Sequence, residues 1–506
     1  MTAGSVRWWL PSLADFLYIA ILLWMITFTV VDTGTGLIQD AGTGYHIRVG
    51  EWVLDHHAVP HQDILSFTRA GKPWFAWEWL ASTGFAAIYR LAGMKGVIVG
   101  SAFVIAWSVL LILRHMAWRG ANALVVLLLI HFGIGASSIH YLARPHIFTL
   151  LFMAVSLWLL DADRNRNTAA IWLIVPLTAL WANMHGGFAG ILASTALIAF
   201  GSIIQAWMDR ANRGIHRKSA IRYASLSAGC LLASVLNPYG FEEHKHIFDY
   251  MNQKWLVEIV EEFQSPNFHA IQGLYFEVLL LTGVFVAIRL LARKEIASAL
   301  LILAWGHLSL VSVRHVPIFV IVLLPFAASE LSSLWRACIV TLPPRSIPGT
   351  LDKIGSDHAP SLQRNTIFAL LVTVLLASFS FGLPYPVDFP QPRYPVSLIN
   401  RHAGLIAGAH VFTTDSWGDY LTFRFYPQQR IFIDGRSDFF GERFSGEYTA
   451  TLYGHRGWEK VLRENGVDVV MVPADAGLAS LLRDRPDWTA VEDAAGVALF
   501  RINGKF

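Results

Sequence analysis

The stretch Val97-Ile-Val-Gly-Ser-Ala-Phe-Val-Ile-Ala-Trp-Ser-Val-Leu-Leu-Ile-Leu113 contains no charged residue. A bilayer core needs about 20 mostly apolar residues in one helix. Backbone in contact with lipid must also satisfy its hydrogen bonds internally, which favours helices. The stretch therefore predicts a membrane-spanning helix. Comparable apolar runs recur along the chain, at Tyr18–Val31, Phe188–Trp207, Leu274–Leu291, Ala297–Val313, Val316–Ala328 and Ile367–Phe381.

The composition of the 506-residue chain agrees with a membrane protein. Hydrophobic residues make up 54% and charged residues only 15%, whereas soluble domains average about 25% charged residues. The formal net charge of +3 identifies no partner, and we expect no nucleic-acid partner. Cys230 and Cys338 lie in or beside apolar segments, so a disulfide framework is not expected.

Twelve segments are predicted to be membrane helices, at 12–31, 77–93, 96–113, 121–143, 147–160, 169–183, 187–207, 221–236, 273–292, 296–313, 315–335 and 366–384. Basic clusters at 209–222, 289–294 and 336–364 should be cytoplasmic, and Arg7 indicates the same for the N-terminus. Twelve simple spans contradict this assignment. A broken hairpin in 121–143, turning at Gly133 and Gly135, restores it with thirteen helices, some of them broken. Arg114 and Arg119 then fall outside.

The C-terminal tail has a different pattern. Val411-Phe412, Arg430–Ile433, Val467–Val472 and Val497–Ile502 are typical of strands, and 417–426, 454–464 and 476–483 of helices. Strands that alternate with helices indicate a small soluble α/β domain. The sequence therefore predicts a membrane domain over 1–389, with an outer loop at 32–78, and an extracytoplasmic domain over 390–506.

The first polar loop, Asp32 to Glu78, interleaves aromatic side chains with carboxylates. Aromatic faces suit the apolar faces of sugars and also the membrane interface. A carboxylate just above the membrane could take a proton from an attacking hydroxyl group. The alternative interpretation is a solvated loop with an interfacial aromatic belt. The predicted topology brings four other polar groups to the same face, at Arg144 with His146, Asn183 with His185, 237–272, and Arg314 with His315.

Several motifs resemble a group of bacterial membrane proteins related to the GT-C glycosyltransferases. That superfamily includes protein O-mannosyltransferases and the aminoarabinose transferases of lipid A. The loop contributes Asp40, Gly-Tyr-His46, Gly-Glu-Trp52, Val-Pro-x-x-Asp63, Ser-Phe-Thr68, Gly-Lys-Pro-Trp74 and Glu78-Trp-Leu. The other motifs are Ala-Arg144-Pro-His146, Trp-Ala-Asn183-Met-His185-Gly-Gly, Asn237-Pro-Tyr-Gly, Glu261-Glu-Phe-Gln-Ser-Pro, Arg314-His315-x-Pro and Asp434-Gly-Arg436-x-Asp438.

This resemblance implies transfer of a sugar from a polyprenyl-phosphate-linked donor to a lipid, glycan or protein outside the membrane, usually with inversion. An acidic residue of the first outer loop would be the base. Asp40 matches best, and Asp63 and Asp32 are alternatives. The departure from the family pattern is that no Asp-Glu or Asp-x-Asp pair occurs at Asp40.

The remaining expected site residues surround that base. Arginine binds phosphate as a planar fork, so Arg144 and Arg314 could form a clamp on the lipid phosphate. The alternative is that both snorkel to lipid headgroups. Residues expected to shape the pocket are His46, Arg48, Glu78, His146, Asn183, His185 and His315. The loop of Asp434, Arg436 and Asp438 could contact a ligand or form a buried ion pair.

No cofactor is required by this interpretation, although a divalent metal cation is possible. His56, His57 and His61 fit no zinc signature, and we assign no metal ligand. The expected location is the bacterial cytoplasmic membrane, with the N-terminus cytoplasmic. Two other functions remain open. A transporter or flippase would show internal repeats and charges near the midplane, and a non-catalytic scaffold would use the tail to bind a partner.

Overall fold

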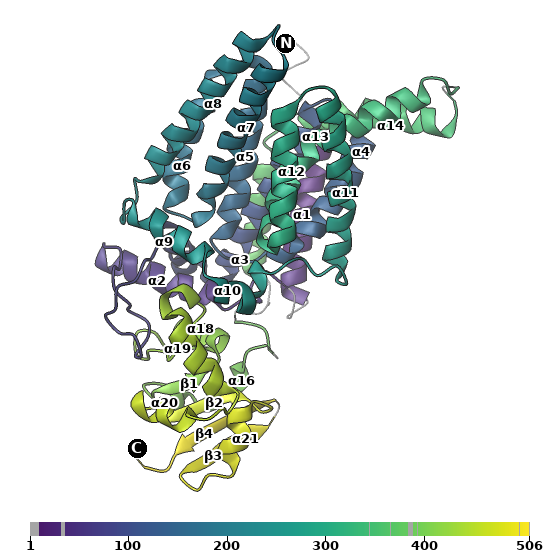
Figure 1. Cartoon of the computed structure of the whole chain (residues 1–506). Helices are drawn as coiled ribbons and strands as arrows, with labels where there is room; N and C mark the ends of the chain where they lie inside the picture. The colour runs from purple at the N-terminus through teal and green to yellow at the C-terminus, as the bar shows by residue number, and fades with distance from the viewer. Residues whose placement is uncertain are drawn as a thin grey trace.

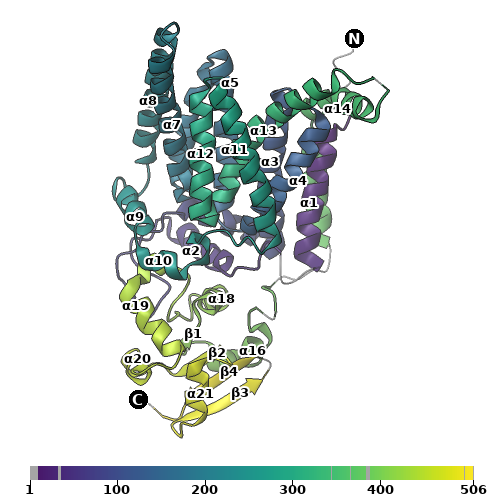
Figure 2. The same ribbon diagram turned by 45° about the vertical axis from the view of Figure 1, so that its right-hand side comes forward.

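The computed structural model of the chain describes residues 10–31, 36–343, 345–364, 366–382, 388–391, 393–494 and 496–504. Arg7 and Asp32, both named above, lie outside these residues. A bundle of long helices forms one part, and a small domain with a sheet is stacked on one end of it (Figures 1 and 2). The bundle consists of α1 (Leu13–Val31), α3 (Trp79–Trp118), α4 (Ala123–Ser137), α5 (His146–Arg166), α6 (Ile174–Ala182), α7 (Ala189–Met208), α8 (Arg213–Ser234), α11 (Ile271–Ala292), α12 (Ile296–Val311), α13 (Val316–Ile339) and α15 (Phe368–Gly382).

The bundle confirms a polytopic helical membrane protein. Among the described residues, six helices are long and apolar enough to cross a membrane, or seven if α14 (Ile347–Gln363) and the helix after it form one bent span. Three shorter apolar helices cover Leu13–Thr27, Ala169–Ala182 and Ile296–Val311. By this criterion the count is below the expected twelve or thirteen, because several of the expected segments are shorter or partly polar helices.

The predicted span 77–93 is wrong. Residues 79–92 form the first part of α3, which breaks at Gly93, where φ is +62°. This part packs against α2 (Gly42–His56), so closely that a Cβ on Gly50 would lie 1.9 Å from the Ser82 carbonyl oxygen. Its start lies beside the functional site described below, and the residues after it border a cleft with the tail. Both ends therefore face the tail, and α2 lies across the end of the bundle (Figure 2).

The predicted hairpin in 121–143 is also wrong, because α4 runs without a turn through Gly133 and Gly135. These glycines allow close packing instead. A Cβ would lie 2.7 Å from Leu324 at Gly133 and 2.4 Å from Tyr275 at Gly135. Glycine is needed at these two positions because neighbouring helices pack closely there, and not because the chain turns.

Removing 77–93 from the count places the three basic clusters at one end of the bundle without a hairpin. They follow α7, α11 and α13, at the end opposite the sheet (Figure 1). Arg119 lies at that same end and pairs with Asp161 at 2.6 Å. The prediction that Arg114 and Arg119 lie on the side of the tail is therefore wrong.

The tail has the expected α/β character. Its sheet has the order β1-β2-β4-β3, in which β1 pairs parallel with β2 and the other pairs are antiparallel. The strands are β1 (Val411–Thr413), β2 (Val469–Pro473), β3 (Trp488–Ala494) and β4 (Val497–Ile502). The helices are α16 (Val396–Arg401), α17 (Ala403–Ile406), α18 (Asp415–Phe425), α19 (Ser437–Leu452), α20 (Trp458–Glu464) and α21 (Gly477–Arg483).

The segment Arg430–Ile433, predicted to be a strand of this sheet, pairs with the first loop instead. Ile431 donates its backbone N–H to the Leu65 carbonyl at 3.0 Å, and Phe67 donates to the Ile431 carbonyl at 3.0 Å. This bridge joins the loop to the tail. The helices α9 (Glu242–Met251) and α10 (Lys254–Ile259) lie between the bundle and the tail (Figure 1).

Candidate functional site

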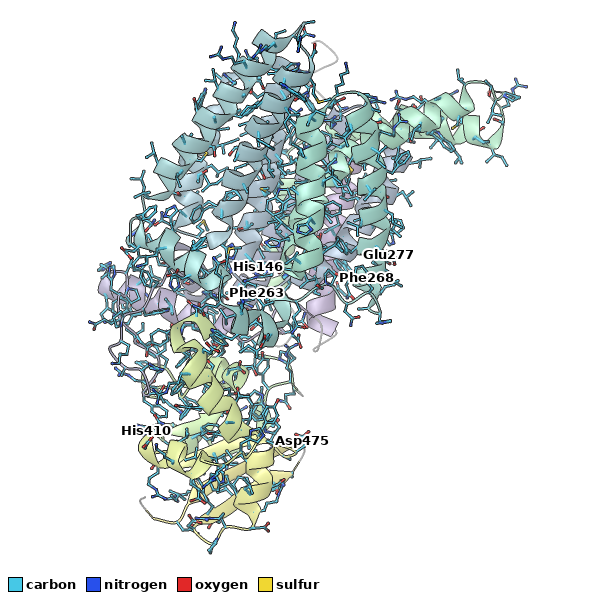
Figure 3. The ribbon with its side chains drawn as sticks, in the orientation of Figure 1. His146, Phe263, Phe268, Glu277, His410 and Asp475 are labelled. Carbon is cyan, nitrogen blue, oxygen red and sulfur yellow. The ribbon has the colours of Figure 1, made fainter. Side chains whose placement is uncertain are left out.

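Two arginines and two carboxylates form a continuous cluster at the tail-facing end of the bundle. Nη1 of Arg144 lies 2.8 Å from Oδ2 of Asp40 and 3.0 Å from Oε1 of Glu262. The other Glu262 oxygen lies 3.2 Å from Nε of Arg314. Arg144 and Arg314, expected to act together, thus meet on one carboxylate. In Figure 3, Phe263 and His146 mark this region between the bundle and the tail.

Three short hydrogen bonds hold the segments of Asp40, Arg144 and Glu262 in place. Oδ1 of Asp40 accepts the N–H of Gly42 at 2.7 Å, which closes the turn before α2. The Thr43 hydroxyl donates to the carbonyl of Ala143, next to Arg144, at 2.8 Å. On the other side, the Ser312 hydroxyl donates to the Glu262 carbonyl at 2.8 Å. The first turn of α2 is therefore tied to the turn before α5, and the turn before α13 is tied to the segment that carries Glu262.

The cluster is charged. Although burial acts in the opposite direction, the guanidinium groups of Arg144 and Arg314 hold the pKa of Glu262 below its usual range. Burial lowers the pKa of Arg144, but Asp40 and Glu262 outweigh it and raise that pKa well above its usual value. Charge-assisted hydrogen bonds of this kind are shorter and stronger than neutral ones.

A groove of about 580 Å³ opens beside the cluster. Its polar side chains include Asp40, His140, Glu262 and Arg393, and its apolar walls come from α1 and from the residues that follow α4. The wall residues include Trp24, Met25, Ile139 and Leu142. The groove therefore combines charged side chains with apolar walls that suit hydrocarbon.

Glu78 forms a second centre at the start of α3, between two imidazole rings. Its carboxylate oxygens lie 3.5 Å from Nε2 of His46 and 3.6 Å from Nε2 of His185. Burial raises the pKa of Glu78 to about 7, against the lowering effect of Arg144 and Arg314. Burial also lowers the pKa of both imidazoles well below 6.5, with Arg144 contributing. Near neutral pH, the carboxyl group changes its charge while the two rings stay neutral.

The orientation of the His185 ring follows from its partners. The backbone N–H of Gly187 donates to Nδ1 at 3.0 Å, so Nδ1 is an acceptor and Nε2 carries the proton that faces Glu78. Asn183 supports the same corner from behind. Its Oδ1 accepts from Trp79 Nε1 at 2.9 Å, and its Nδ2 donates to the Leu236 carbonyl at 2.8 Å.

The structure brings several expected residues to this region but not all of them. His146 lies near His185, with a ring separation of 6.4 Å, and contacts the His140 carbonyl through Nε2. His315 uses Nδ1 on the Leu308 carbonyl at 3.1 Å and packs on Trp305, so it faces the inside of the bundle. Arg48 points to the tail, where Nε donates to the Phe423 carbonyl at 2.8 Å.

Asp63 lies in a buried ion cluster with the tail loop. Arg436 places Nη1 2.8 Å from Asp63 and Nη2 2.6 Å from Asp434, and the two carboxylate side chains are 0% exposed. The tail loop was predicted either to contact a ligand or to form a buried ion pair. The contacts of Arg436 are those of a buried ion pair. Asp438 instead pairs with Nε2 of His246 at 2.9 Å.

Glu262 is the member of the cluster that was not among the expected site residues, although its segment 237–272 was predicted to lie on the same face. The available signal was an acidic pair, Glu261-Glu262, on the face that carries Arg144 and Arg314. Within the described ranges, no group of three or more His, Cys, Asp or Glu side chains could hold a metal ion. The expected possibility of a divalent cation therefore has no ligand set among those residues.

No family model matches this sequence, and the curated proteins contain no match to it. Solved structures do resemble the fold. The oligosaccharyltransferase of Archaeoglobus fulgidus aligns with 91% of this chain and 69% of its own at a TM-score of 0.55 and 11% identity. The same enzyme, AglB, in complex with an inhibitory peptide and a dolichol-phosphate, gives a TM-score of 0.53 at 12% identity, with 91% of this chain and 70% of its own covered.

ArnT from Cupriavidus metallidurans bound to undecaprenyl phosphate covers 96% of this chain and 97% of its own, with a TM-score of 0.52 and 12% identity. The likeness extends over the bundle and the tail together. The GT-C-like architecture expected from the sequence motifs is therefore confirmed as the fold of this chain.

Proposed function

We propose that the protein is a membrane glycosyltransferase of GT-C type. It moves a sugar from a polyprenyl-phosphate-linked donor to a lipid, glycan or protein acceptor. The observation that carries this proposal is the cluster of Asp40, Arg144, Glu262 and Arg314 beside the 580 Å³ groove. Asp40 and Glu262 line this groove, and Arg144 and Arg314 pair with them from behind, so a lipid phosphate that replaces a carboxylate there would reach a guanidinium group.

The roles of Asp40, Arg144 and Arg314 follow from the bonds that form and break in the transfer. Asp40 accepts the proton of the acceptor hydroxyl as its oxygen bonds to the anomeric carbon. The bond from that carbon to the lipid phosphate breaks, and the phosphate oxygen keeps the electron pair. Arg144 and Arg314 stabilise this developing charge. Solved structures of ArnT and AglB with undecaprenyl phosphate and dolichol-phosphate support a donor of this class.

Asp40 is preferred over the other two aspartates because of where they lie. Asp40 borders the groove and is partly exposed. Asp63 is fully buried against Arg436 and is committed to joining the loop to the tail. Asp32 lies outside the described residues.

We assign Glu78, His46 and His185 to binding of the acceptor or sugar beside the base. Glu78 is an acceptor when ionised, and the Nε2 proton of His185 is a donor, so the pair can hold a hydroxyl group. Asn183 acts through these residues by fixing the start of α3.

We place the protein in the bacterial cytoplasmic membrane, with residues 1–389 as the membrane domain and 390–506 on the extracytoplasmic side. The support is the gathering of the basic clusters after α7, α11 and α13 at the end opposite the tail. Basic loops favour the cytoplasmic side, so the groove and the tail open outward.

The decisive experiment is transfer from a radiolabelled polyprenyl-phosphate sugar by the purified chain in vesicles that contain extracted envelope acceptors. Asp40→Asn should reduce transfer by about 100-fold or more, because general base catalysis supplies roughly 10²–10⁴. Asp55→Asn is the matched control, since Asp55 is an exposed carboxylate paired with Arg90 in the same region.

Transfer that Asp40→Asn leaves intact would rule out Asp40 as the base. Movement of the labelled lipid across the bilayer by the wild-type chain, without any sugar transfer, would instead identify a flippase.

A further inference from the structure

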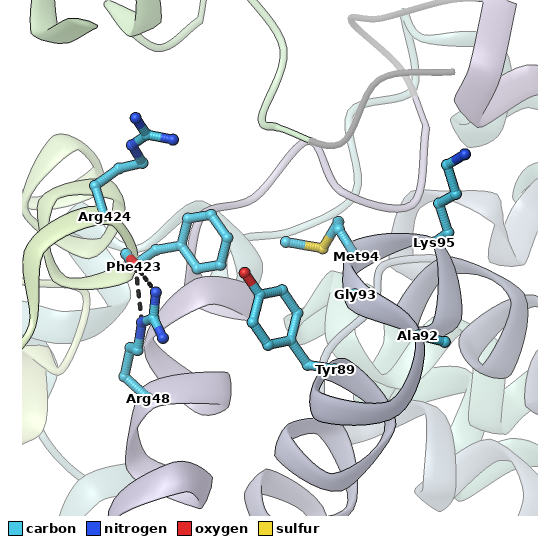
Figure 4. A pocket seen from close by; sticks show the side chains of 8 residues that line it. All are labelled: Arg48, Tyr89, Ala92, Gly93, Met94, Lys95, Phe423 and Arg424. Atoms are coloured by element: carbon cyan, nitrogen blue, oxygen red, sulfur yellow. Dashed lines mark hydrogen bonds between the residues drawn. The ribbon is translucent and has the colours of Figure 1, made fainter. Parts of the chain in front are cut away.

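A second cavity, of about 480 Å³, lies between the bundle and the tail, next to α2. Three cationic side chains line it, and none of the described lining residues is acidic. The lining residues are Arg48, Tyr89, Ala92, Gly93, Met94, Lys95, Phe423 and Arg424 (Figure 4). The cations come from three separate elements, which are α2, the break in α3, and α18 of the tail.

The cavity is separate from the 580 Å³ groove because the two have no lining residue in common, and it is also separate from the Glu78 centre. Successive helical residues are about 100° apart, so positions 46 and 48 point in different directions. His46 faces Glu78, whereas the guanidinium of Arg48 lies 5.2 Å from the Phe423 ring centre and 5.8 Å from that of Tyr89. In Figure 4, Arg48 and Arg424 lie on one side of the cavity and Lys95 on the other.

The cationic groups are held in place from outside the cavity. Arg48 pairs with Glu51 at 2.6 Å, and Arg424 contacts Asn400 at 2.8 Å and Asp388 at 3.3 Å. These partners fix the direction of the guanidinium groups. Among the described residues that line the cavity none is acidic, so an anion bound there would be surrounded by cationic side chains.

The level of the cavity relative to the membrane indicates the kind of anion. At Gly93, α3 changes from a segment that lies across the bundle end to a segment that spans the membrane. The boundary between these segments is where lipid headgroups lie. Next to the cavity lining, Leu91 is 87% exposed, as suits contact with acyl chains.

We propose that this cavity, defined by Arg48, Lys95 and Arg424, binds the phosphate headgroup of an anionic membrane phospholipid. Arg48 and Arg424 offer N–H donors and Lys95 an ammonium group, as phosphate recognition requires. The bound lipid joins the tail helix α18 to the membrane surface. This site is independent of sugar transfer, and it does not rest on the proposed catalytic roles.

The test measures melting of the detergent-solubilised full chain as dioctanoyl phosphatidylglycerol is added. A ligand that binds only the folded state raises the melting temperature with concentration. The lipid should raise it, and dioctanoyl phosphatidylcholine at equal concentration should not. Lys95→Gln and Arg424→Gln should each weaken the apparent affinity about tenfold, the usual size of one lost hydrogen bond to a charged group.

Arg90→Gln is the matched control, because Arg90 is a nearby basic residue that pairs with Asp55 outside the cavity. It should leave the affinity unchanged. Equal weakening by all three variants would mean general surface attraction and overturn the site. If inorganic phosphate raises the melting temperature as much as the lipid does, the proposed ligand is wrong and the cavity binds a soluble phosphate. Asp40→Asn should not alter the response of the melting temperature to the lipid. Failure of the catalytic proposal can therefore be told apart from failure of the lipid-site proposal.

Discussion

At the scale of single residues, Glu78 is the most unusual side chain of the site. It is a carboxyl group enclosed by rings that stay neutral, so burial dominates its titration and the two arginines reduce the shift only in part. Desolvation disfavours the charged form of a carboxyl group. A group with a pKa near 7 can gain or lose a proton at physiological pH, as catalytic sites often require.

Glu78→Gln should stabilise the protein at high pH. Because the folded pKa of about 7 exceeds the ordinary value of 4.5, the folded state binds more protons between those values, and stability falls as pH rises through that window. The variant has no such loss. Its free energy of unfolding at pH 8 should exceed that of the wild type by up to about 3 kcal/mol.

Melting curves at pH 5 and pH 8 provide the measurement for Glu78→Gln. The advantage of the variant should shrink toward pH 5, where the wild-type carboxyl group is mostly protonated. Equal differences at both pH values would show that the pKa of Glu78 is not raised. Glu261→Gln, on an exposed neighbour of the cluster, should change neither curve.

The sequence could predict the positions of site residues only where their contact partners lie nearby in the sequence. Arg144 and Arg314 were placed on one face by charge parity alone. Both arginines contact Glu262, which lies 118 residues after Arg144 in the sequence. No local sequence pattern reveals a contact over that separation. Arg48, expected in the same pocket as His46, lines the second cavity instead, because helical geometry directs its side chain away from His46.

At the scale of elements, glycines determine how α3 and α4 run. Gly93 has a positive φ and ends the segment that lies across the bundle, whereas Gly133 and Gly135 stay helical and let neighbours approach. Sequence alone predicted a turn at the latter pair, because glycine permits both turns and close contacts. Only the position of α13 and of Tyr275 decides between the two.

A pair of glycine substitutions tests this packing. Gly135→Ala would place a Cβ 2.4 Å from the Tyr275 ring, and overpacking of this kind costs about 1–3 kcal/mol. Gly84→Ala is the control, since its Cβ meets nothing within 4 Å and alanine favours a helix by about 1 kcal/mol. Thermal melting should show a loss for the first and no loss for the second. Equal stability of both variants would contradict close packing at Gly135.

At the scale of the whole molecule, the first loop connects the bundle and the tail. Asp63 pairs with Arg436, Leu65 and Phe67 bond to Ile431, and Arg48 donates to the Phe423 carbonyl. The hydrophobic pattern of Arg430–Ile433 correctly indicated extended backbone. Its partner could not be identified, because that partner lies more than 360 residues earlier in a loop without a strand pattern.

Arg436→Gln should loosen the tail. It leaves Asp63 and Asp434 buried without their cation, and breaking a buried pair in this way costs about 3–5 kcal/mol. Limited proteolysis of the full chain should cut the variant faster near residue 390 than the wild type. Arg443→Gln is the control, because that side chain is 92% exposed. If Arg436→Gln is cleaved at the wild-type rate, the ion cluster does not hold the tail to the first loop.

The cluster at the groove has a consequence for selectivity. Asp40, Glu262, Arg144 and Arg314 carry two negative and two positive charges, so the empty site is electrically balanced. A stray anion finds no surplus of positive potential there. A phosphate gains a guanidinium only if a carboxylate gives it up, and the many weak contacts of a long hydrocarbon chain can drive that exchange. If the proposed function holds, we therefore expect the site to discriminate against small soluble phosphates and to favour those attached to lipid.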